Sequence, residues 1–290
     1  MDYKTKELLD KFLEEENVKS AEDVERALAK FMELYNSNQL EFEETPMSKA
    51  YDYLAQAEDA DTITKARKYA RKALEVCPEC IDAEVFLAEL EDSIFKAETI
   101  LANAIEKERA RLEQEGYFTK ENIGCFYGIY ETRGYLKALS HLAHLCAFEG
   151  KSSKAIEICK EIMRLNNNDN LGVRYLLMGL YAYLEDEKSL QKLYNKYDEE
   201  SLSTLIPFMI INYKKSDYTN AKLYLDRINK CNKNFIKVFK GTMKSKSDIP
   251  NGYFSPGDSS EVDMYLLNYL FLFASVPSID EFITKNGVVI

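Results

Sequence analysis

The stretch that decides the fold is YLKALSHLAHLCAFEGKSSKAIEICKEIMRLNNNDNLGVR, residues 135–174. Two segments with apolar residues at helical spacing meet at Gly150, and an Asn/Asp-rich turn follows them. Glycine between two such segments is typical of a tight turn between helices, because it readily adopts left-handed backbone angles. We therefore expect one helix–turn–helix unit here and imperfect copies of it along the chain.

Small residues recur at the matching place in the second helix of each expected copy. Ala155 and Ser189 are 34 positions apart, and Ser189 and Ala221 are 32 positions apart. A period near 34 is that of tetratricopeptide repeats, in which each helix pair buries its apolar face on the next pair. The pattern predicts an all-α, right-handed solenoid of tetratricopeptide-like helix pairs.

The expected organisation has three parts. Residues 1–45 form an N-terminal helical segment, residues 46–234 form the repeats, and residues 235–290 form a helical C-terminal cap whose apolar side closes the solenoid. An insertion at 116–135, rich in aromatic residues and glycine, interrupts the repeats. Capping segments of this kind are expected because a terminal repeat has no neighbour to cover it.

Composition limits the class of partner and the compartment. The formal net charge is −11, which makes nucleic acid an unlikely partner because an acidic chain repels phosphate. The longest apolar stretch, Met264–Val276, is too short to span a bilayer. With no secretory signal, we expect the six cysteines to be reduced and the protein to be cytoplasmic. The oligomeric state stays open.

Three segments, Ala70–Glu89, Glu131–Leu177 and Asn232–Phe271, resemble a tetratricopeptide family. Their residues, and the order of the three segments, are similar to those of the bacterial relatives of the suppression-of-tumorigenicity-seven family. The resemblance implies the repeat fold, and it implies no particular biochemical activity. The chain departs from the family pattern at four positions, with Tyr127 in place of Trp and with three residues in place of Pro: Gly134, Asn167 and Lys233.

Two sets of residues have the form of metal or redox sites. Cys77 and Cys80 form a C-x-x-C pair, which could be redox-active or bind zinc, but the turn between two repeat helices explains the pair without either role. His141 and His144 lie three apart on one helix, so both could serve a metal or acid–base chemistry. We favour a structural turn for the cysteines and a ligand-facing or solvated position for the histidines, with no cofactor.

The insertion offers a second candidate site at Tyr127, Glu131 and Arg133. One interpretation is a polar and aromatic ligand site. The other is a structural plug, in which Arg133 pairs with an internal carboxylate and the aromatic rings fill the gap left where the repeat register is broken. We favour the plug, because aromatic residues in a loop usually pack.

One basic run could bind an acidic peptide or a nucleic acid, or could be a solvated face that balances an acidic chain; we favour the solvated face. It consists of Arg227, Lys230, Lys233, Lys237, Lys240, Lys244 and Lys246. The chain has no nucleotide-binding loop, zinc-protease motif or serine-hydrolase motif. We therefore expect no enzyme and assign no catalytic residues.

The repeat register predicts which side chains line the concave groove formed by the first helices of the pairs. These are Lys137, Ser140, His144, Arg174, Met178 and Tyr181. Two cations among apolar groups suit an extended peptide with carboxylates. The sequence therefore predicts a non-enzymatic scaffold for a protein or peptide partner. The alternative is an intracellular peptide-sensing regulator whose solenoid changes pitch when the peptide binds.

Overall fold

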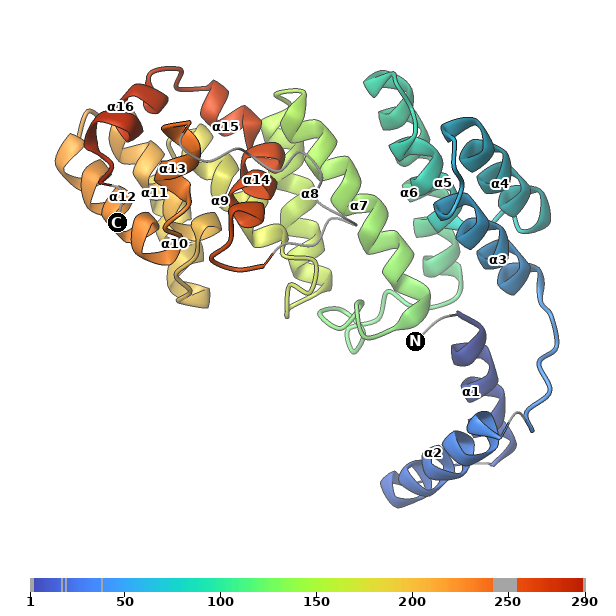
Figure 1. The fold of residues 1–290 in the computed structure, drawn as a ribbon. Helices are drawn as coiled ribbons and strands as arrows, with labels where there is room; N and C mark the ends of the chain where they lie inside the picture. Colours follow the sequence, from blue (N-terminus) through green and yellow to red (C-terminus); the bar gives the residue numbers. More distant parts are fainter. Residues whose placement is uncertain (1–2, 17, 19, 38, 242–254, 289–290) are drawn as a thin grey trace. The chain divides into compact units, whose positions relative to one another are not determined.

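The structure, a computed structural model, describes residues 3–16, 18, 20–37, 39–241 and 255–288. About 72% of it is helix, and these residues contain no β-strand. Neighbouring helices pack in pairs, as a helical solenoid requires (Figure 1). The chain divides into two compact units, 1–104 and 105–290, and the division falls inside α6 (Ile94–Gln114). We describe each unit by itself.

Besides the start of α6, the described residues of the first unit contain two helix pairs and one further helix. These helices are α1 (Tyr3–Glu15), α2 (Ala21–Asn36), α3 (Pro46–Glu58), α4 (Ile63–Val76) and α5 (Ile81–Glu89). The expected boundary at Pro46 is the first residue of α3, where a missing N–H does no harm. Thr45 and Ser48 form a reciprocal capping box that satisfies two further N–H groups there.

Small residues allow α3 and α4 to pack closely. Ala66, Ala70 and Ala73 are all buried along one face of α4. Ala73 belongs to an apolar cluster with Ala50 and Leu54 of α3. The small alanine side chain lets the two backbones come close together. The i, i+4, i+7 spacing of these residues therefore marks the face on which α4 packs.

Besides the end of α6, the described part of the second unit contains three helix pairs followed by four C-terminal helices. They are α7 (Tyr130–Phe148), α8 (Ser152–Leu165), α9 (Val173–Tyr183), α10 (Glu187–Tyr197), α11 (Leu202–Lys214), α12 (Tyr218–Cys231), α13 (Phe235–Phe239), α14 (Ser259–Asn268), α15 (Leu270–Ala274) and α16 (Ile279–Asn286). Within the pairs, α7 lies against α8, α9 against α10, and α11 against α12.

The same turn joins the two helices of each of these three pairs. Gly150, Glu185 and Ser216 have φ angles of 74°, 61° and 60°, so each is the left-handed residue that ends a helix. A characteristic backbone hydrogen bond closes each turn, from Lys151 N to Cys146 O, from Asp186 N to Tyr181 O, and from Asp217 N to Asn212 O. The repeat is therefore visible in the backbone as well as in the spacing of small residues.

The insertion packs against the end of α8. Phe126 is fully buried, and its N–H donates to the Leu165 carbonyl at 3.0 Å. Gly124, with a φ of 100°, lies so close to this segment that an added Cβ would be 2.3 Å from Asn167 Nδ2. The irregular part is shorter than predicted, because α7 already begins at Tyr130.

The C-terminal helices do more than cap the last pair. α16 packs on α13, and the Phe282 ring lies 5.0 Å from the Tyr213 ring of α11. By contrast, α15 contacts α7 and α9, and α14 contacts α11 (Figure 1). This differs from the predicted cap: part of the C-terminal region lies along the first helices of the pairs, because their apolar faces still need cover.

Gly179 of α9 lies in close contact with these C-terminal helices. A Cβ added there would lie 3.1 Å from the Tyr269 ring and 3.4 Å from the Phe271 ring. One turn further along α9, the Tyr183 ring packs edge-on to Phe271 at 5.9 Å between ring centroids. The absence of a side chain at Gly179 is therefore what lets α15 lie directly on α9.

We predict that Gly179→Leu loosens α14 and α15 while the helix pairs stay folded. Overpacking costs about 1–3 kcal/mol, which exceeds the gain of about 1 kcal/mol from replacing a helical glycine. Hydrogen exchange should become faster in α14 and α15. Lys192→Leu, an exposed position on α10, is the control and should leave the exchange unchanged. Unchanged exchange in Gly179→Leu would contradict this packing.

Candidate functional site

A pocket of about 470 Å³ lies in the second unit, at the start of α9. We call it the α9 pocket. Its wall on the repeat side comes from α7, the α8–α9 loop, α9 and α11, and its other wall comes from α14 and Tyr269. The lining residues are His144, Asp169, Asn170, Leu171, Gly172, Arg174, Tyr175, Ser203, Glu261, Met264, Tyr265, Asn268 and Tyr269.

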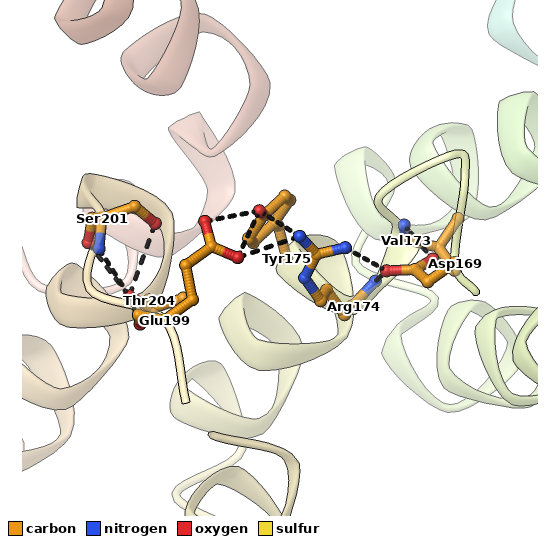
Figure 2. Close-up of polar contacts among 7 residues, drawn as sticks. All are labelled: Asp169, Val173, Arg174, Tyr175, Glu199, Ser201 and Thr204. Carbon is orange, nitrogen blue, oxygen red and sulfur yellow. Dashed lines mark hydrogen bonds and ion pairs between the residues drawn. The ribbon is translucent and has the colours of Figure 1, made fainter. Parts of the chain in front are cut away.

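Asp169 organises the repeat side of the pocket. Its carboxylate is buried and accepts the N–H groups of Val173 and Arg174 at 2.9 and 3.1 Å. The same carboxylate accepts Nη1 of the Arg174 side chain at 2.9 Å (Figure 2). The negative charge lies at the N-terminal end of α9, where it interacts favourably with the positive end of the helix dipole. One buried carboxylate thus caps α9 and holds Arg174.

Arg174 connects Asp169 to the next repeat. Its Nη2 donates to Glu199 at 2.9 Å and also contacts the Tyr175 hydroxyl, which donates to Glu199 at 2.8 Å (Figure 2). The guanidinium lies 4.1 and 4.9 Å from the ring centroids of Tyr175 and Tyr197. Partial burial lowers the pKa of Arg174, but its bonds to the two carboxylates outweigh that effect and raise it overall.

Tyr175 is held as a neutral phenol by its position in this network. Burial, and then the hydrogen bond to Glu199, raise the pKa of Tyr175 to about 12. Glu199 is fixed in turn through its carbonyl, which accepts the Thr204 hydroxyl at 2.8 Å (Figure 2). The network therefore joins the loop before α9 to the loop before α11, and it positions one wall of the pocket.

The charged groups of the pocket are already used by the fold. Glu261 accepts the side chain of Asn232 at 2.9 Å and the N–H of Gly257 at 2.8 Å, so it anchors the start of α14. Asp169 and Arg174 satisfy each other. Because these charges have partners, the groups left to meet a ligand are neutral hydrogen-bonding and aromatic side chains.

His144 is one of these neutral groups. Its side chain is exposed, and its Nδ1–H donates to the Ser140 carbonyl at 2.9 Å. The surrounding protein lowers the pKa of His144 below 6.5, more than that hydrogen bond raises it. At neutral pH the imidazole is uncharged and offers Nε2 as an acceptor.

Stacked tyrosines form the opposite wall. The rings of Tyr265 and Tyr269 lie 4.2 Å apart at an interplanar angle of 16°. Both are buried, and burial raises the pKa of each phenol. Asn268 lies between them in the chain and is exposed at the end of α14. This wall combines aromatic surface with a side-chain amide.

The structure corrects the predicted groove. Met178 and Tyr181 are only 1% and 7% exposed, so they do not line an open surface. Gly179 and Tyr183 of α9 contact the C-terminal helices. Gly179 is one residue beyond Met178 and Tyr183 is two beyond Tyr181, so these contacts lie about 100–200° around the helix from the predicted positions.

The other predicted groove residues have different positions. His144 and Arg174 line the α9 pocket, although Arg174 is held by two carboxylates. Ser140 is half-buried, and its carbonyl accepts the bond from His144. Lys137 is exposed on α7 and is not among the residues that line the pocket. The predicted set is therefore only partly brought together.

The insertion residues gather with one another, away from the pocket lining. Arg133 Nε donates to the Tyr127 carbonyl at 2.8 Å, and the guanidinium lies over the Tyr127 and Tyr130 rings. Its hydrogen-bond acceptor is thus a backbone carbonyl, whereas we had expected a carboxylate. Glu131 and Arg133 are both in α7 and half-buried.

The cysteine pair has no disulfide between its members, and both thiols are buried. Within residues 3–16, 18, 20–37, 39–241 and 255–288, no group of three or more His, Cys, Asp or Glu side chains could hold a metal ion. Burial is the main cause that raises the pKa of the Cys80 thiol to about 12. These surroundings favour the neutral thiol over a reactive thiolate.

Part of the basic run also has structural partners. Arg227 pairs with Glu200, and Lys240 Nζ donates to the Gly287 carbonyl at 2.8 Å. Lys244 and Lys246 lie outside the described residues. Arg227 thus ties α12 to the loop before α11, and Lys240 ties the end of α13 to the end of α16.

Sequence comparison adds no family assignment. No protein-family model matches the chain, and no curated protein matches it either. The resemblance to the suppression-of-tumorigenicity-seven family stays a prediction. A search of the described helices for an apolar span found none of sufficient length and hydropathy to cross a membrane.

The residues missed by sequence reasoning are mainly Asp169, Tyr175, Glu199 and Asn268. A signal existed for Asp169, because an Asn/Asp-rich turn before a helix often supplies a capping carboxylate. Glu199 and Asn268 had no such signal, since each reaches the site from a segment more than twenty residues away in the chain. Long-range packing alone assigns them to it.

We predict that Arg174→Ala lowers the free energy of unfolding by about 3 kcal/mol. The change leaves the buried Asp169 carboxylate without its cation, and breaking a buried pair costs about 3–5 kcal/mol. The lower end applies because Glu199 is partly exposed. Urea denaturation measures the effect, and Lys137→Ala is the control, with a change within about 0.5 kcal/mol. Equal stability of the two variants would show that the network is not structural.

We predict unequal alkylation of the cysteines by iodoacetamide at pH 8. Burial is also the main cause that raises the pKa of Cys159 to about 12. At pH 8 the thiolate fraction of Cys80 and Cys159 is then about 10⁻⁴, whereas Cys125 is exposed. Peptide mass spectrometry should show Cys125 modified at least 100-fold faster. Comparable rates for Cys80 and Cys125 would indicate a reactive C-x-x-C pair after all.

Proposed function

We propose that this protein is a non-enzymatic scaffold that binds a short segment of a protein or peptide partner in the α9 pocket. The observation that carries the proposal is the pocket lining, in which the charged groups are already held by ion pairs or hydrogen bonds within the protein while neutral hydrogen-bonding groups remain. Hydroxyl, amide and imidazole groups can pair with the N–H and C=O groups of a peptide backbone. Aromatic walls supply apolar contact at little cost in conformational entropy.

The volume of the pocket supports a short ligand. At about 470 Å³ it falls within the range of about 300–1,000 Å³ that is common for ligand sites. An extended peptide running along the first helices of the pairs, as the sequence predicted, would compete with α14 and α15. We therefore propose binding at the edge of those helices, on a right-handed tetratricopeptide-like solenoid. The cytoplasmic location also remains a prediction.

One observation favours the regulatory alternative as a second candidate. The pocket takes one wall from the repeats and the other from α14 and Tyr269. A ligand that contacts both walls would change how firmly α14 and α15 are held, by as much as its affinity differs between the two arrangements. Under this alternative, the bound peptide alters the pitch of the solenoid.

We predict that octapeptides selected from a random displayed library on the full chain bind in the α9 pocket. Asn268→Trp places an indole at the pocket, so affinity for a selected peptide should fall at least tenfold. The matched control is Leu223→Trp, an exposed position on α12, which should bind normally. Isothermal titration calorimetry measures both affinities.

The same experiment separates the two candidates. Faster or slower hydrogen exchange in α14 and α15 on peptide binding would favour the regulator, and unchanged exchange would favour the plain scaffold. If no peptide is enriched, or if Asn268→Trp binds as well as the wild type, the α9 pocket is not a peptide site.

A further inference from the structure

The helix α2 exposes a continuous apolar stripe. Val24, Leu28, Met32 and Tyr35 are 37%, 37%, 54% and 38% exposed, and we call them the α2 stripe. Their spacing of four, four and three residues places all of them along one side of the helix. A scattered exposed apolar residue is ordinary, but a full line of them on one helix marks a docking surface.

Three of the four stripe residues, Val24, Leu28 and Met32, are separate from the packing that forms the N-terminal hairpin, whereas Tyr35 also stacks on Phe31. The buried contacts of α2 with α1 are made by Ala27 and Phe31, which pack with Phe12. Phe31 and Phe12 lie 5.7 Å apart between ring centroids. Val24, Leu28 and Met32 do not belong to this cluster.

The other side of α1 is used within the same unit. Tyr3 stacks on Tyr51 of α3 at 4.8 Å between ring centroids, and Lys4 pairs with Asp52 at 2.7 Å. Thr45 donates to Glu7 at 2.9 Å. The hairpin is thus attached to α3 through α1, and α2 presents the stripe on its own surface.

Charge on the flank of the stripe indicates the kind of partner. Counting 3.6 residues per turn, Glu22, Glu25 and Glu33 follow the stripe on the side away from Ala27 and Phe31. All three are exposed, and none forms an ion pair with another described residue. The cations of α2 are engaged elsewhere, because Arg26 pairs with Asp23 and Lys30 pairs with Glu16.

The whole N-terminal segment has the same charge character. Residues 1–45 carry thirteen acidic and six basic side chains, a net charge of −7 out of −11 for the chain. Such a surface repels anionic lipid and nucleic acid, and it also repels a second copy of itself. A cationic partner would be attracted to it and steered onto the stripe.

We propose that the α2 stripe is a docking surface for a cationic amphipathic helix of a partner protein. The apolar face of that helix packs on Val24, Leu28 and Met32, and its Lys or Arg flank faces Glu22, Glu25 and Glu33. This surface belongs to the first unit and uses no residue of the α9 pocket. Its test therefore succeeds or fails independently of the proposed peptide site.

The test uses the full chain and a fluorescein-labelled 18-residue peptide. The peptide has Leu at i, i+4 and i+7 spacing with Lys on the flanks. One comparison peptide has Glu in place of every Lys, and a second scrambles the Lys peptide so that no apolar face forms. Fluorescence anisotropy should show the Lys peptide binding at least tenfold more tightly than either, with weaker binding at higher salt.

The variant Leu28→Ala/Met32→Ala should weaken binding of the Lys peptide at least tenfold. Alanine keeps the helix propensity of α2, and circular dichroism checks that the helix content is unchanged. The matched control is Phe95→Ala, which removes another exposed apolar side chain of the first unit, 75% exposed, and should bind normally. Glu22→Gln/Glu25→Gln should reduce the salt dependence.

Three outcomes would overturn the proposal. If the scrambled peptide bound as tightly as the Lys peptide, the binding would be explained by the overall negative charge of the chain alone. If Leu28→Ala/Met32→Ala bound the Lys peptide as tightly as the wild type, the stripe would not be part of the binding surface. Sedimentation showing a wild-type dimer that this variant dissociates would assign the stripe to a second copy of the chain instead.

Discussion

Each helix pair in this protein leaves an apolar face that something must cover, and that constraint shapes the second unit. α8, α10 and α12 cover one side of α7, α9 and α11. On another side the chain uses its own C-terminal helices, and Gly179 has no side chain so that α15 can lie against α9. The face that a scaffold could offer to a partner is thereby largely occupied within the chain.

What this packing leaves open is a pocket with particular chemistry. Arg174 pairs with both Asp169 and Glu199, and the three side chains hold two inter-helix loops in a fixed relation (Figure 2). The network is structural, because its charged groups cap α9 and join one repeat to the next. The ligand-facing character comes instead from neutral neighbours, of which His144 is an example with a lowered pKa.

The two units differ in the kind of surface that they present. In the second unit, the candidate site is a polar pocket between packed helices. In the first unit, it is a line of apolar side chains on one helix flanked by carboxylates. A pocket of the first kind selects ligands by hydrogen-bond geometry, whereas a stripe of the second kind selects by periodicity and charge.

The sequence by itself determined the helices and the period of their pairing, since these depend on neighbouring residues. The small residues Ala155 and Ala221 are buried and Gly150 forms a left-handed turn, as the sequence pattern predicted. The equivalent turns at Glu185 and Ser216 were not readable, because there the backbone hydrogen bonds of the helix end hold a left-handed angle without glycine.

Only the tertiary structure decided which side of α9 is covered and what lines the pocket. Each residue turns a helix by about 100°, so an error of one or two residues selects another face: the prediction chose Met178 and Tyr181, whereas Gly179 and Tyr183 contact the C-terminal helices. Glu199 and Asn268 reach the pocket from distant segments, and no local pattern encodes such contacts. They arise because apolar faces distant in the chain are buried together, which depends on the packing of the whole unit.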